Sequence, residues 1–261
     1  MNPATFKIAT WNVNSLNVRL PHVLDWLSAN KPDVLCLQET KQEDSKFPYE
    51  ALKEAGYNAI HNGQKTYNGV AILSPHAIED AQFDIPNFED DQKRIITATI
   101  NGMRIVCAYI VNGQAVDSEK YEYKMRWLTA LTNWLQSEVN AHPNFALLGD
   151  YNIAPDDRDC HDPAAWIGQI LVSPQERDAF KKLVALGLHD SFRLFEQGEG
   201  HFSWWDYRMA GFRRNLGMRI DHILISTPLV AQCKSSWIDK TPRKLERPSD
   251  HTPVVLELNY P

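Results

Sequence analysis

Short apolar segments alternate along this chain with longer segments of helical periodicity. Residues 6–11 alternate between apolar and polar positions, as in a half-buried β-strand. Apolar residues over 20–27 recur at the spacing of one helix face, and Pro32 follows them as a helix breaker. Residues 34–37 are continuously apolar, which is typical of a buried strand. The first part of the chain therefore predicts a strand, a helix and a second strand.

The middle of the chain predicts a tight hairpin followed by a long helix and another strand. Residues 95–100 and 103–111 are strand-like, and the dipeptide Asn-Gly at 101–102 readily supplies the two positive-φ positions of a two-residue turn. The apolar stripe over 125–139 has helical spacing, and residues 145–148 form a further buried-strand run.

Residues near position 173 predict the start of another helix. Ser173 is a capping residue, Pro174 suits the first helical position, and Glu176 stands three residues after the cap. The expected inner face consists of Phe180, Leu183 and Val184, and Gly187 suits the C-terminal exit. Three more strand-like runs follow at residues 220–225, 236–238 and 254–258.

This order of elements favours a layered α/β architecture in which helices cover packed sheets. No repeat, low-complexity tract or linker interrupts the sequence, so we expect a single domain over residues 1–261. No apolar run approaches the roughly 18 residues of a membrane helix. The first residues also lack the pattern of a secretory leader. We therefore expect a cytoplasmic protein without membrane association.

Charge and cysteine content narrow the function classes. The chain has 27 Lys and Arg against 33 Asp and Glu, a net charge of −6, which argues against a protein that coats nucleic acid over its whole surface. A local basic face remains compatible with this balance. The four cysteines include no CxxC pair, so we expect thiols in a reducing compartment rather than a disulfide framework.

Carboxylate, carboxamide and imidazole side chains stand where the apolar runs begin or end. Loop ends of this kind are where α/β folds place their sites. One such residue is usually a turn residue, but the same chemistry at five run ends favours convergence on one cleft. The residues concerned are Asn12, Glu39, Asp150, Asn152, Asp221, Asp250 and His251.

The chemistry of this set points to a divalent metal and a phosphate ester. The oxygen donors of Glu39, Asp150 and Asp250, with the amides of Asn12 and Asn152, suit Mg²⁺, with Mn²⁺ able to substitute. A compact His/Cys set, as in a zinc site, is missing from the sequence. A metal held by few carboxylates beside a histidine fits phosphate-ester hydrolysis.

The Ser-Asp-His run at 249–251 suggests a serine hydrolase as an alternative. Adjacent side chains on an extended backbone point to opposite faces, so Asp250 is poorly placed to orient the imidazole of its neighbour His251. A GxSxG elbow is also missing from the sequence. We expect His251 to pair with Asp221 instead and, once protonated, to stabilise charge on the phosphate. Asp150 can then deprotonate an attacking water.

Seven short segments carry a family resemblance. They are TWNVNSL at 10–16, LQETK at 37–41, NGVAI at 68–72, GDYNIAP at 149–155, FSWWDYR at 202–208, RIDH at 219–222 and PSDH at 248–251. Any one segment is weakly specific, whereas the ordered set is highly specific and spans nearly the whole chain. Together they resemble the exonuclease III / apurinic-apyrimidinic endonuclease family, within the endonuclease/exonuclease/phosphatase superfamily.

The resemblance implies a four-layer α/β sandwich of two mixed β-sheets packed face to face and flanked by helices. It also implies Mg²⁺-dependent hydrolysis of DNA phosphodiesters. It makes Glu39 the principal metal ligand, and gives Asp150 the activation of the nucleophile and Asn152 its positioning. The implied metal group is Asn12, Glu39, Asp150, Asn152, Asp250 and His251. The implied catalytic group is Tyr109, Asp150, Asn152, Asp221 and His251.

The segment after Tyr109 departs from the family pattern. Members commonly place Pro or another breaker after this tyrosine, where this chain has Ile110 and Val111. The departure concerns the path of the loop more than the role of the tyrosine. The pattern alone would make Tyr109 a strand aromatic.

Two basic stretches border the expected site. Residues 207–219 hold four arginines and no acid, and residues 240–247 hold four basic residues against one glutamate. We expect phosphate contacts from Arg208, Arg213 and Arg214, which position a duplex without reading its sequence. By resemblance, the side chains that line a pocket for an extruded baseless sugar are Trp204, Met218 and Ile220, although ordinary packing explains these residues equally well. The segment 160–173, where family members differ, is expected to shape substrate preference.

The expected function is that of a monomeric DNA-repair nuclease acting on double-stranded DNA. Its activities would be cleavage 5′ of abasic sites, 3′→5′ exonuclease action and trimming of blocked 3′ ends. A first alternative keeps the metal chemistry but acts on a small or lipid phosphoester, and the aromatic and arginine-rich segment 204–214 argues for DNA instead. A second alternative, a DNA-binding module with a dead site, conflicts with competent residues at every acid, base and metal position.

Overall fold

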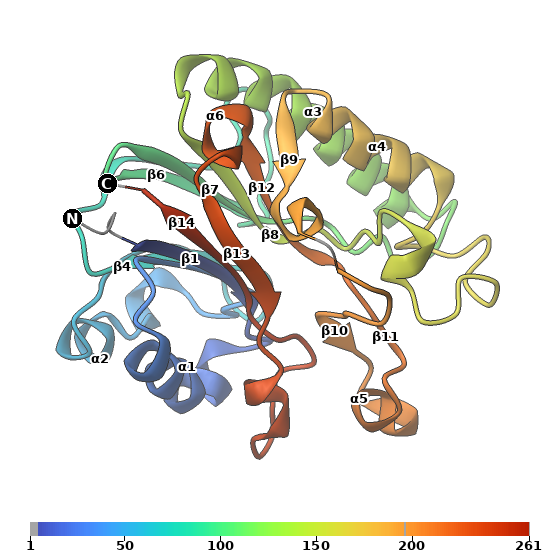
Figure 1. The fold of residues 1–261 in the computed structure, drawn as a ribbon, viewed down its shortest axis with the longest axis horizontal. Coiled ribbons are helices and arrows are strands. Elements are labelled where there is room, and N and C mark those ends of the chain that lie inside the picture. The colour runs from blue at the N-terminus through green and yellow to red at the C-terminus, as the bar shows by residue number, and fades with distance from the viewer. Residues whose placement is uncertain (1–4, 196, 261) are drawn as a thin grey trace.

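Two six-stranded β-sheets packed face to face form the centre of the molecule, with helices on both outer faces (Figure 1). The computed structural model describes residues 5–195 and 197–260. The expectation about a leader falls partly on residues 1–4, outside this range. One sheet has the strand order β13-β14-β1-β2-β4-β3 and the other β5-β6-β7-β8-β12-β9. The four-layer α/β sandwich is thus confirmed.

The elements have the following bounds. The first sheet contains β1 (Thr5–Asn12), β2 (Val34–Gln38), β3 (Asn58–Asn62), β4 (Val70–Ser74), β13 (Cys233–Ile238) and β14 (Val254–Asn259). The second contains β5 (Glu79–Phe83), β6 (Ile95–Ile100), β7 (Met103–Tyr109), β8 (Phe145–Asp150), β9 (Leu188–Asp190) and β12 (Asp221–Ser226). A small two-stranded sheet contains β10 (Trp204–Trp205) and β11 (Gly217–Met218). The helices are α1 (Leu16–Asn30), α2 (Tyr49–Glu54), α3 (Glu119–Ala141), α4 (Pro174–Val184), α5 (Gly211–Arg214) and α6 (Thr227–Val230).

Both large sheets are mixed. β1 runs parallel to β2 and antiparallel to β14, and β7 runs parallel to β8 while β8 is antiparallel to β12. Buried apolar side chains from both sheets, such as Ile8 and Cys36 of the first and Ile105 and Leu148 of the second, form the central core. This shared core fixes one sheet against the other, so the ends of β1, β2, β8 and β12 lie near one another.

Local sequence signals were accurate where they concerned turns and caps. Asn101 and Gly102 have φ values of 48° and 74°, as a two-residue hairpin turn requires. Ser173 and Glu176 form the expected capping box at the start of α4. Gly187 has a φ of 91° just beyond that helix, a conformation that favours glycine.

Some expectations about buried faces were wrong. The centre of the α3 stripe is Lys124, Trp127, Leu128, Leu131, Trp134 and Leu135, whereas Met125 and Val139 are only partly buried. Val184, expected on the inner face of α4, is 37% exposed. β7 ends at Tyr109, whereas the sequence predicted that this strand continues to residue 111. The buried face of α3 thus includes Trp127 and Trp134, which the expected stripe did not contain.

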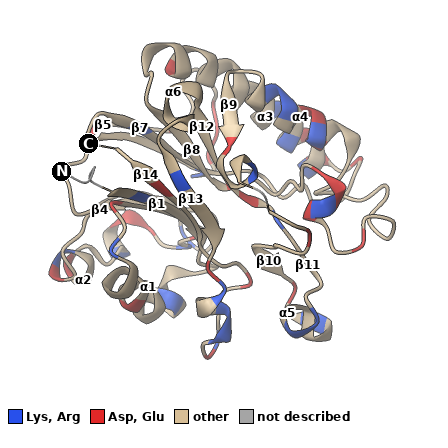
Figure 2. Cartoon of the chain, viewed as in Figure 1, with Lys and Arg blue, Asp and Glu red and all other residues tan. Residues whose placement is uncertain are grey.

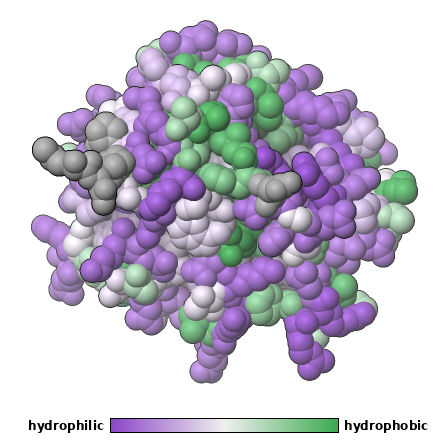
Figure 3. Space-filling model, in the orientation of Figure 1, coloured by the Kyte–Doolittle hydropathy of each residue, from purple (hydrophilic) through white to green (hydrophobic). Residues whose placement is uncertain are grey.

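The cysteines and the helix lengths can be compared with the expectations from the sequence. Cys36, Cys107 and Cys160 are buried, and these three thiols and Cys233 are free. Within residues 5–195 and 197–260, none of the helices combines the length and the apolar character that crossing a bilayer requires. Figure 3 shows hydrophilic side chains over most of the visible face, with smaller apolar areas between them.

Candidate active site

The expected site residues meet at one edge of the two sheets. Asn12 ends β1, Glu39 directly follows β2, and Asp150 ends β8. Asp221 begins β12 and lies directly opposite Asp150 in the β8–β12 ladder, which places the two carboxylates on neighbouring strands. Tyr109 is paired with Asp150 on the other side, at the end of β7.

Three of these side chains form a candidate metal group. One ligand atom each from Glu39, Asp150 and His251 lies within 4.8 Å of the others, a group found by searching the described part of the chain. His251 Nε2 is 3.7 Å from Asp150 Oδ2. Two carboxylates beside one imidazole, with further oxygen donors nearby, form a donor set that suits Mg²⁺ or Mn²⁺. The residues present therefore fit a divalent cation.

Asn12 joins the two carboxylates of this group. Its Nδ2 donates to Glu39 Oε1 and to Asp150 Oδ2, both at 2.9 Å. Its Oδ1 accepts from the main-chain N–H of Asn14. In this arrangement Asn12 holds two like charges side by side through its amide protons. Its expected role as an oxygen ligand of the metal stays a prediction.

Burial and neighbouring charges shift the pKa values of the two carboxyl groups in opposite directions. Burial raises the pKa of Asp150 to about 7, the charges of Asp221 and Glu39 act in the same direction, and His251 and Asn12 only partly offset them. Burial also raises the pKa of Glu39, but Lys41, at 3.0 Å, and Asn12 outweigh it and lower that pKa overall. Asp150 can therefore take up a proton near neutral pH while Glu39 stays charged.

His251 is held between two aspartates. Its Nδ1 lies 2.9 Å from Asp221 Oδ2, so the expected contact between these residues exists in the structure. Burial lowers the pKa of His251, but Asp221 and Asp150 outweigh burial and raise it to about 10. Ser203 Oγ donates to Asp221 Oδ2 at 2.6 Å and thereby fixes the carboxylate. The imidazole is consequently protonated at neutral pH.

Tyr109 points into the same group. Its hydroxyl donates to Glu39 Oε1 at 2.9 Å, and the guanidinium of Arg94 lies 4.7 Å from the centre of its ring. Burial raises the pKa of Tyr109 well above its ordinary value, and the charges of Glu39 and Asp150 add to this effect. Tyr109 is therefore a neutral hydrogen-bond donor. A cleft of about 650 Å³ opens beside it and is also lined by Asn112.

Asn152 is buried and oriented by three contacts. Its Nδ2 donates to Ile110 O at 3.0 Å and to Asp150 Oδ2 at 3.3 Å. Its Oδ1 accepts from Asn112 Nδ2 at 2.9 Å. Its φ of 48° is a left-handed conformation that asparagine tolerates better than most residues, which explains an asparagine at this sharp bend.

Asp250 is engaged differently from the expectation. Its Oδ1 accepts from Asn14 Nδ2 at 2.9 Å and its Oδ2 from Trp204 Nε1 at 3.0 Å. Among the described residues it does not belong to the group formed by Glu39, Asp150 and His251. A metal role for Asp250 stays a prediction, and what the structure shows is that Asp250 links two loops.

Fewer side chains of the two basic stretches are free to contact phosphates than the sequence indicates. Counting Arg219 toward a surface charge was wrong, because its guanidinium is buried and pairs with Asp159 at 2.7 Å and with Asp190 at 2.8 Å. Arg208 is exposed but already paired with Asp206. Arg243, in the second stretch, is also buried. Figure 2 shows Lys and Arg on α5 and on the loop after β13, at the lower edge of the molecule.

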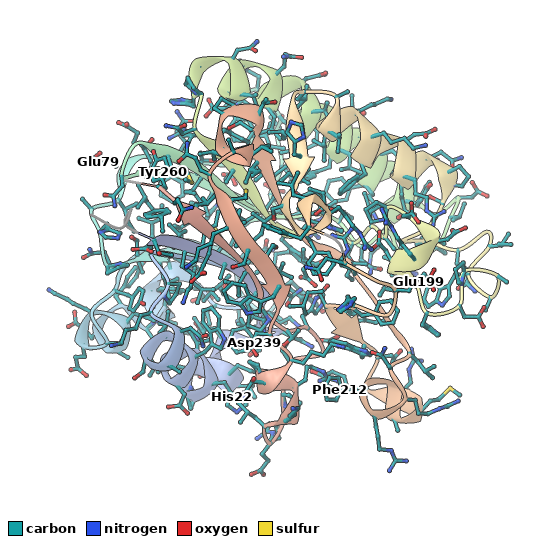
Figure 4. All side chains as sticks on the ribbon, viewed as in Figure 1. His22, Glu79, Glu199, Phe212, Asp239 and Tyr260 are labelled. Carbon is teal, nitrogen blue, oxygen red and sulfur yellow. The ribbon has the colours of Figure 1, made fainter. Side chains whose placement is uncertain are left out.

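The exposed cations lie on two segments that contact each other. Arg213 and Arg214 are exposed on α5. The Arg243 side chain lies 5.0 Å from the centre of the Phe212 ring and thereby joins α5 to the loop after β13. Figure 4 marks Phe212 on the first segment and Asp239 at the base of the second.

The expected sugar-pocket residues are closed in by packing. Met218 is 0% exposed and Ile220 is 1% exposed, in an apolar cluster with Leu171. Trp204 and Trp166 are only partly buried and pack against this cluster. In this structure the packing interpretation describes Met218 and Ile220, and segment 160–173 supplies part of the cover.

Sequence reasoning missed several residues that contact the site. Ser203 lies inside the motif at 202–208, where a polar residue between apolar ones was the available signal, and Asn112 lies three residues after Tyr109. Lys41 stands two residues after Glu39 in a conspicuous Glu-Thr-Lys run. Arg94 lies in no motif considered, so its contact with Tyr109 becomes visible only in three dimensions.

Comparison with known proteins adds a family context to this geometry. Residues 9–251 match the Endonuclease/Exonuclease/phosphatase family. The chain is similar to exodeoxyribonuclease III of Haemophilus influenzae, with 36% identity over 96% of this chain and 99% of the relative.

Two solved structures resemble the fold over nearly its full length. A 3′ phosphatase from Neisseria, bound to a product DNA hairpin, is 48% identical with a TM-score of 0.96, over 98% of this chain and 100% of the other. An AP endonuclease from Archaeoglobus fulgidus is 40% identical with a TM-score of 0.95, over 98% and 100% of the two chains. The similarity therefore extends through every element that carries a site residue.

Proposed function

The chain belongs to the endonuclease/exonuclease/phosphatase family, and on that premise we propose that it is a DNA-repair phosphodiesterase acting as a single catalytic domain. The observation that carries this proposal is the convergence of Glu39, Asp150 and His251 beside the His251–Asp221 pair. The relatives named above, which are a DNA exonuclease, a DNA 3′ phosphatase and an AP endonuclease, support DNA as the substrate.

The proposed roles follow from protonation states and contacts. Asp150, with a pKa of about 7, accepts a proton from the attacking water near neutral pH. Asn152, fixed by Asn112, keeps its amide beside Asp150 and orients that water or the phosphate. Protonated His251 presents its Nε2–H on the Asp150 side and stabilises negative charge on the phosphate. Asp221 keeps the imidazole charged and oriented.

We propose Mg²⁺ as the cofactor, with Mn²⁺ as a substitute, held by Glu39 and Asp150 with the nearby Asn12, Asn152 and Asp250. His251, which belongs to the expected metal group, carries both ring protons at neutral pH and would therefore lie beside the cation without coordinating it. When bound, the cation would polarise a phosphate oxygen and neutralise charge. Tyr109 donates a hydrogen bond to Glu39 and so restricts the rotation of that carboxylate. Lys41 holds the second oxygen of the same carboxylate. These two contacts would keep Glu39 in one orientation for the metal.

We propose three activities on duplex DNA: cleavage 5′ of abasic sites, 3′→5′ exonuclease action and trimming of blocked 3′ ends. The exposed Arg213 and Arg214, with Arg208 once it leaves Asp206, would contact phosphates. Trp204 stands at the edge of the apolar cluster of Met218 and Ile220, which would have to open for an extruded sugar. The protein would act as a monomer in the cytoplasm, where the free thiols of this chain are stable.

An abasic-duplex assay tests the function directly. The protein is incubated with a labelled duplex containing one abasic site, in Mg²⁺, in Mn²⁺ and in EDTA, together with the Asp150→Asn variant in Mg²⁺. We expect cleavage by the unmodified protein in either metal, and loss of at least 10³-fold in rate with EDTA or without the Asp150 carboxylate. Equal cleavage in all arms would refute the proposal. A recessed 3′ end and a 3′-phosphate end run in parallel separate the three activities.

A small or lipid phosphoester is the competing substrate class. The basic surface of α5 and of the loop after β13 favours a polyanion. Competition distinguishes the two: an unlabelled abasic duplex should inhibit at micromolar concentration, whereas a soluble sugar phosphate should not inhibit below millimolar concentration.

A further inference from the structure

A fully buried ion pair lies directly behind the candidate site. Lys124 on α3 and Glu176 on α4 contact each other, and both side chains are 0% exposed. The two helices lie side by side over the outer face of the second sheet (Figure 1). An ion pair removed from water in this way is commonly no more stabilising than apolar packing would be. Its presence therefore calls for an explanation other than fold stability.

The ammonium group of Lys124 also contacts the main chain of both asparagine loops. Its Nζ donates to Asn152 O at 2.7 Å and to Asn112 O at 3.2 Å. A lysine has three N–H donors, and the third is taken by Glu176 Oε1. All three protons are thus used, so the position of the ammonium group is fixed by three acceptors from separate segments.

Glu176 is anchored in turn by the start of α4. Its Oε2 accepts from Ser173 N at 3.0 Å and from Ser173 Oγ at 2.6 Å. Tyr121 OH lies 2.6 Å from Ser173 Oγ, which connects this cap back to α3. A Cβ added at Gly113 would lie 3.3 Å from Lys124 Cδ, so the loop also packs tightly against the lysine stem.

The two loops held by Lys124 carry the amide chain that leads to Asp150. Asn112 Nδ2 donates to Asn152 Oδ1, and Asn152 Nδ2 donates to Asp150 Oδ2. We propose that Lys124 and Glu176 are a positioning pair: the ammonium group fixes the distance between the two loop backbones and so aims the Asn152 amide at Asp150. This inference rests on the proposed function, because its main readout is DNA cleavage.

A pair with a purely structural role makes a different prediction from a positioning pair. Breaking the pair at one side leaves an uncompensated buried charge, whereas removing both charges restores stability. Lys124→Met and Glu176→Gln keep side-chain length, and glutamine still completes the capping box at Ser173. Only the variants that lack the ammonium group lose the carbonyl contacts to both loops.

The experiment compares four full-length variants with the unmodified protein: Lys124→Met, Glu176→Gln, the double variant, and a control. Thermal midpoint, kcat and KM on an abasic duplex in Mg²⁺ are measured for each. Lys124→Met should lower the midpoint by roughly 10 °C. The double variant should recover to within roughly 3 °C of the unmodified protein, yet both should show kcat reduced roughly 100-fold with KM changed less than threefold. Glu176→Gln, which keeps the ammonium group and its contacts to both loop carbonyls, should lose less than tenfold in kcat.

The chain offers a matched control in a second ion pair that also involves α3. Arg104 of β7 pairs with Glu138 of α3 at 2.8 Å. Glu138 lies about 21 Å along the helix from Lys124, at the end remote from the site. Arg104→Met/Glu138→Gln should keep kcat within twofold. A double variant at 124 and 176 that recovers both its thermal midpoint and its kcat, or that changes KM alone, would overturn the proposal.

A measurement that does not depend on DNA cleavage tests the positioning role separately from the proposed function. In nuclear magnetic resonance spectra, the side-chain NH₂ protons of the buried Asn152 should exchange slowly in the unmodified protein and in Arg104→Met/Glu138→Gln. They should exchange at least tenfold faster in both variants that lack the Lys124 ammonium group. Inactivity of the unmodified protein would refute the proposed function while this exchange test still decides the positioning role. Unchanged exchange in Lys124→Met would overturn the positioning role whatever the activity.

Discussion

Replacing Asp221 with asparagine tests whether charge pairing keeps His251 protonated. His251 Nδ1 lies 2.9 Å from Asp221 Oδ2, and Nε2 lies 3.7 Å from Asp150 Oδ2. Burial opposes the charged imidazole, yet the two carboxylates raise the pKa of His251 to about 10. This is about 3.5 units above the ordinary value of 6.5, which corresponds to about 5 kcal/mol in favour of the imidazolium.

The direction of the pH effect follows from this raised pKa. In the unmodified protein His251 stays charged until the pH rises toward about 10, so activity should not fall between pH 7 and 9 for lack of this proton. Asp221→Asn removes the nearer charge, and the pKa of His251 should fall toward about 6.5. Activity of the variant should then decline above about pH 6.5, and at pH 8 it should be roughly 30-fold lower, because only about 3% of the imidazole is still protonated. The acidic limb, set by Asp150 with a pKa of about 7, should move to lower pH in the variant, because the charge of Asp221 helps to raise that pKa.

The assay is kcat/KM on an abasic duplex from pH 6 to 9, with the His251 ring followed by nuclear magnetic resonance in the same range. Asp239→Asn is the matched control, because Asp239 accepts from Trp26 Nε1 at 2.8 Å and touches none of the site residues named above. The control should keep the profile of the unmodified protein. If kcat/KM declined at the same alkaline pH in Asp221→Asn and in the unmodified protein, the reasoning that this carboxylate holds the proton on His251 would be refuted.

Three further predictions follow from single contacts. Tyr109→Phe removes the hydrogen bond to Glu39 and should raise the metal concentration for half-maximal activity roughly tenfold, measured by metal titration. Burial lowers the pKa of His222 to about 4, so its contribution of about 3 kcal/mol is present above pH 6.5 and lost as the pH falls through 4. Denaturant titrations should show a shallower acid loss in His222→Gln. Arg213→Ala/Arg214→Ala should reduce the salt dependence of duplex binding by about two units of log–log slope, measured by fluorescence anisotropy.

The elements that sequence predicted well are those whose signal is local. A capping box, an Asn-Gly turn and a continuous apolar strand each need only a few neighbouring residues, and all three were found where expected. The missed elements lack such signals. β5 is exposed along its whole length, so it shows no apolar alternation, and β9 contains three residues. These strands form because a neighbouring strand offers hydrogen bonds, and a single sequence does not encode that partner visibly.

The sequence predicted which strand ends meet at the candidate site, because polar residues at the ends of buried strands form a recognisable pattern. The direction of each hydrogen bond was not predictable. Asn12 was expected to offer oxygen to a metal, which stays a prediction, and the structure shows its amide donating to two carboxylates. Asp250 was expected in the same group, which also stays a prediction, and the structure shows its carboxylate accepting from Asn14 and Trp204. A motif gives the donor and acceptor atoms, and only the packed structure pairs them.

Buried cations show the limit of sequence reasoning most clearly. Arg219 was counted as surface charge and Lys124 was left out of the helix stripe, although its spacing of four and seven residues from Leu128 and Leu131 matches that stripe. A cation in such a position is ordinarily taken as solvated, because burial without partners costs several kcal/mol. The partners exist here, Asp159 for Arg219 and main-chain carbonyls for Lys124, but they come from segments far away in the sequence. When a cationic residue occupies a position in the buried stripe of a helix near a site motif, we therefore expect it to have a partner inside the fold. The search for that partner should start at the loops that carry the motif.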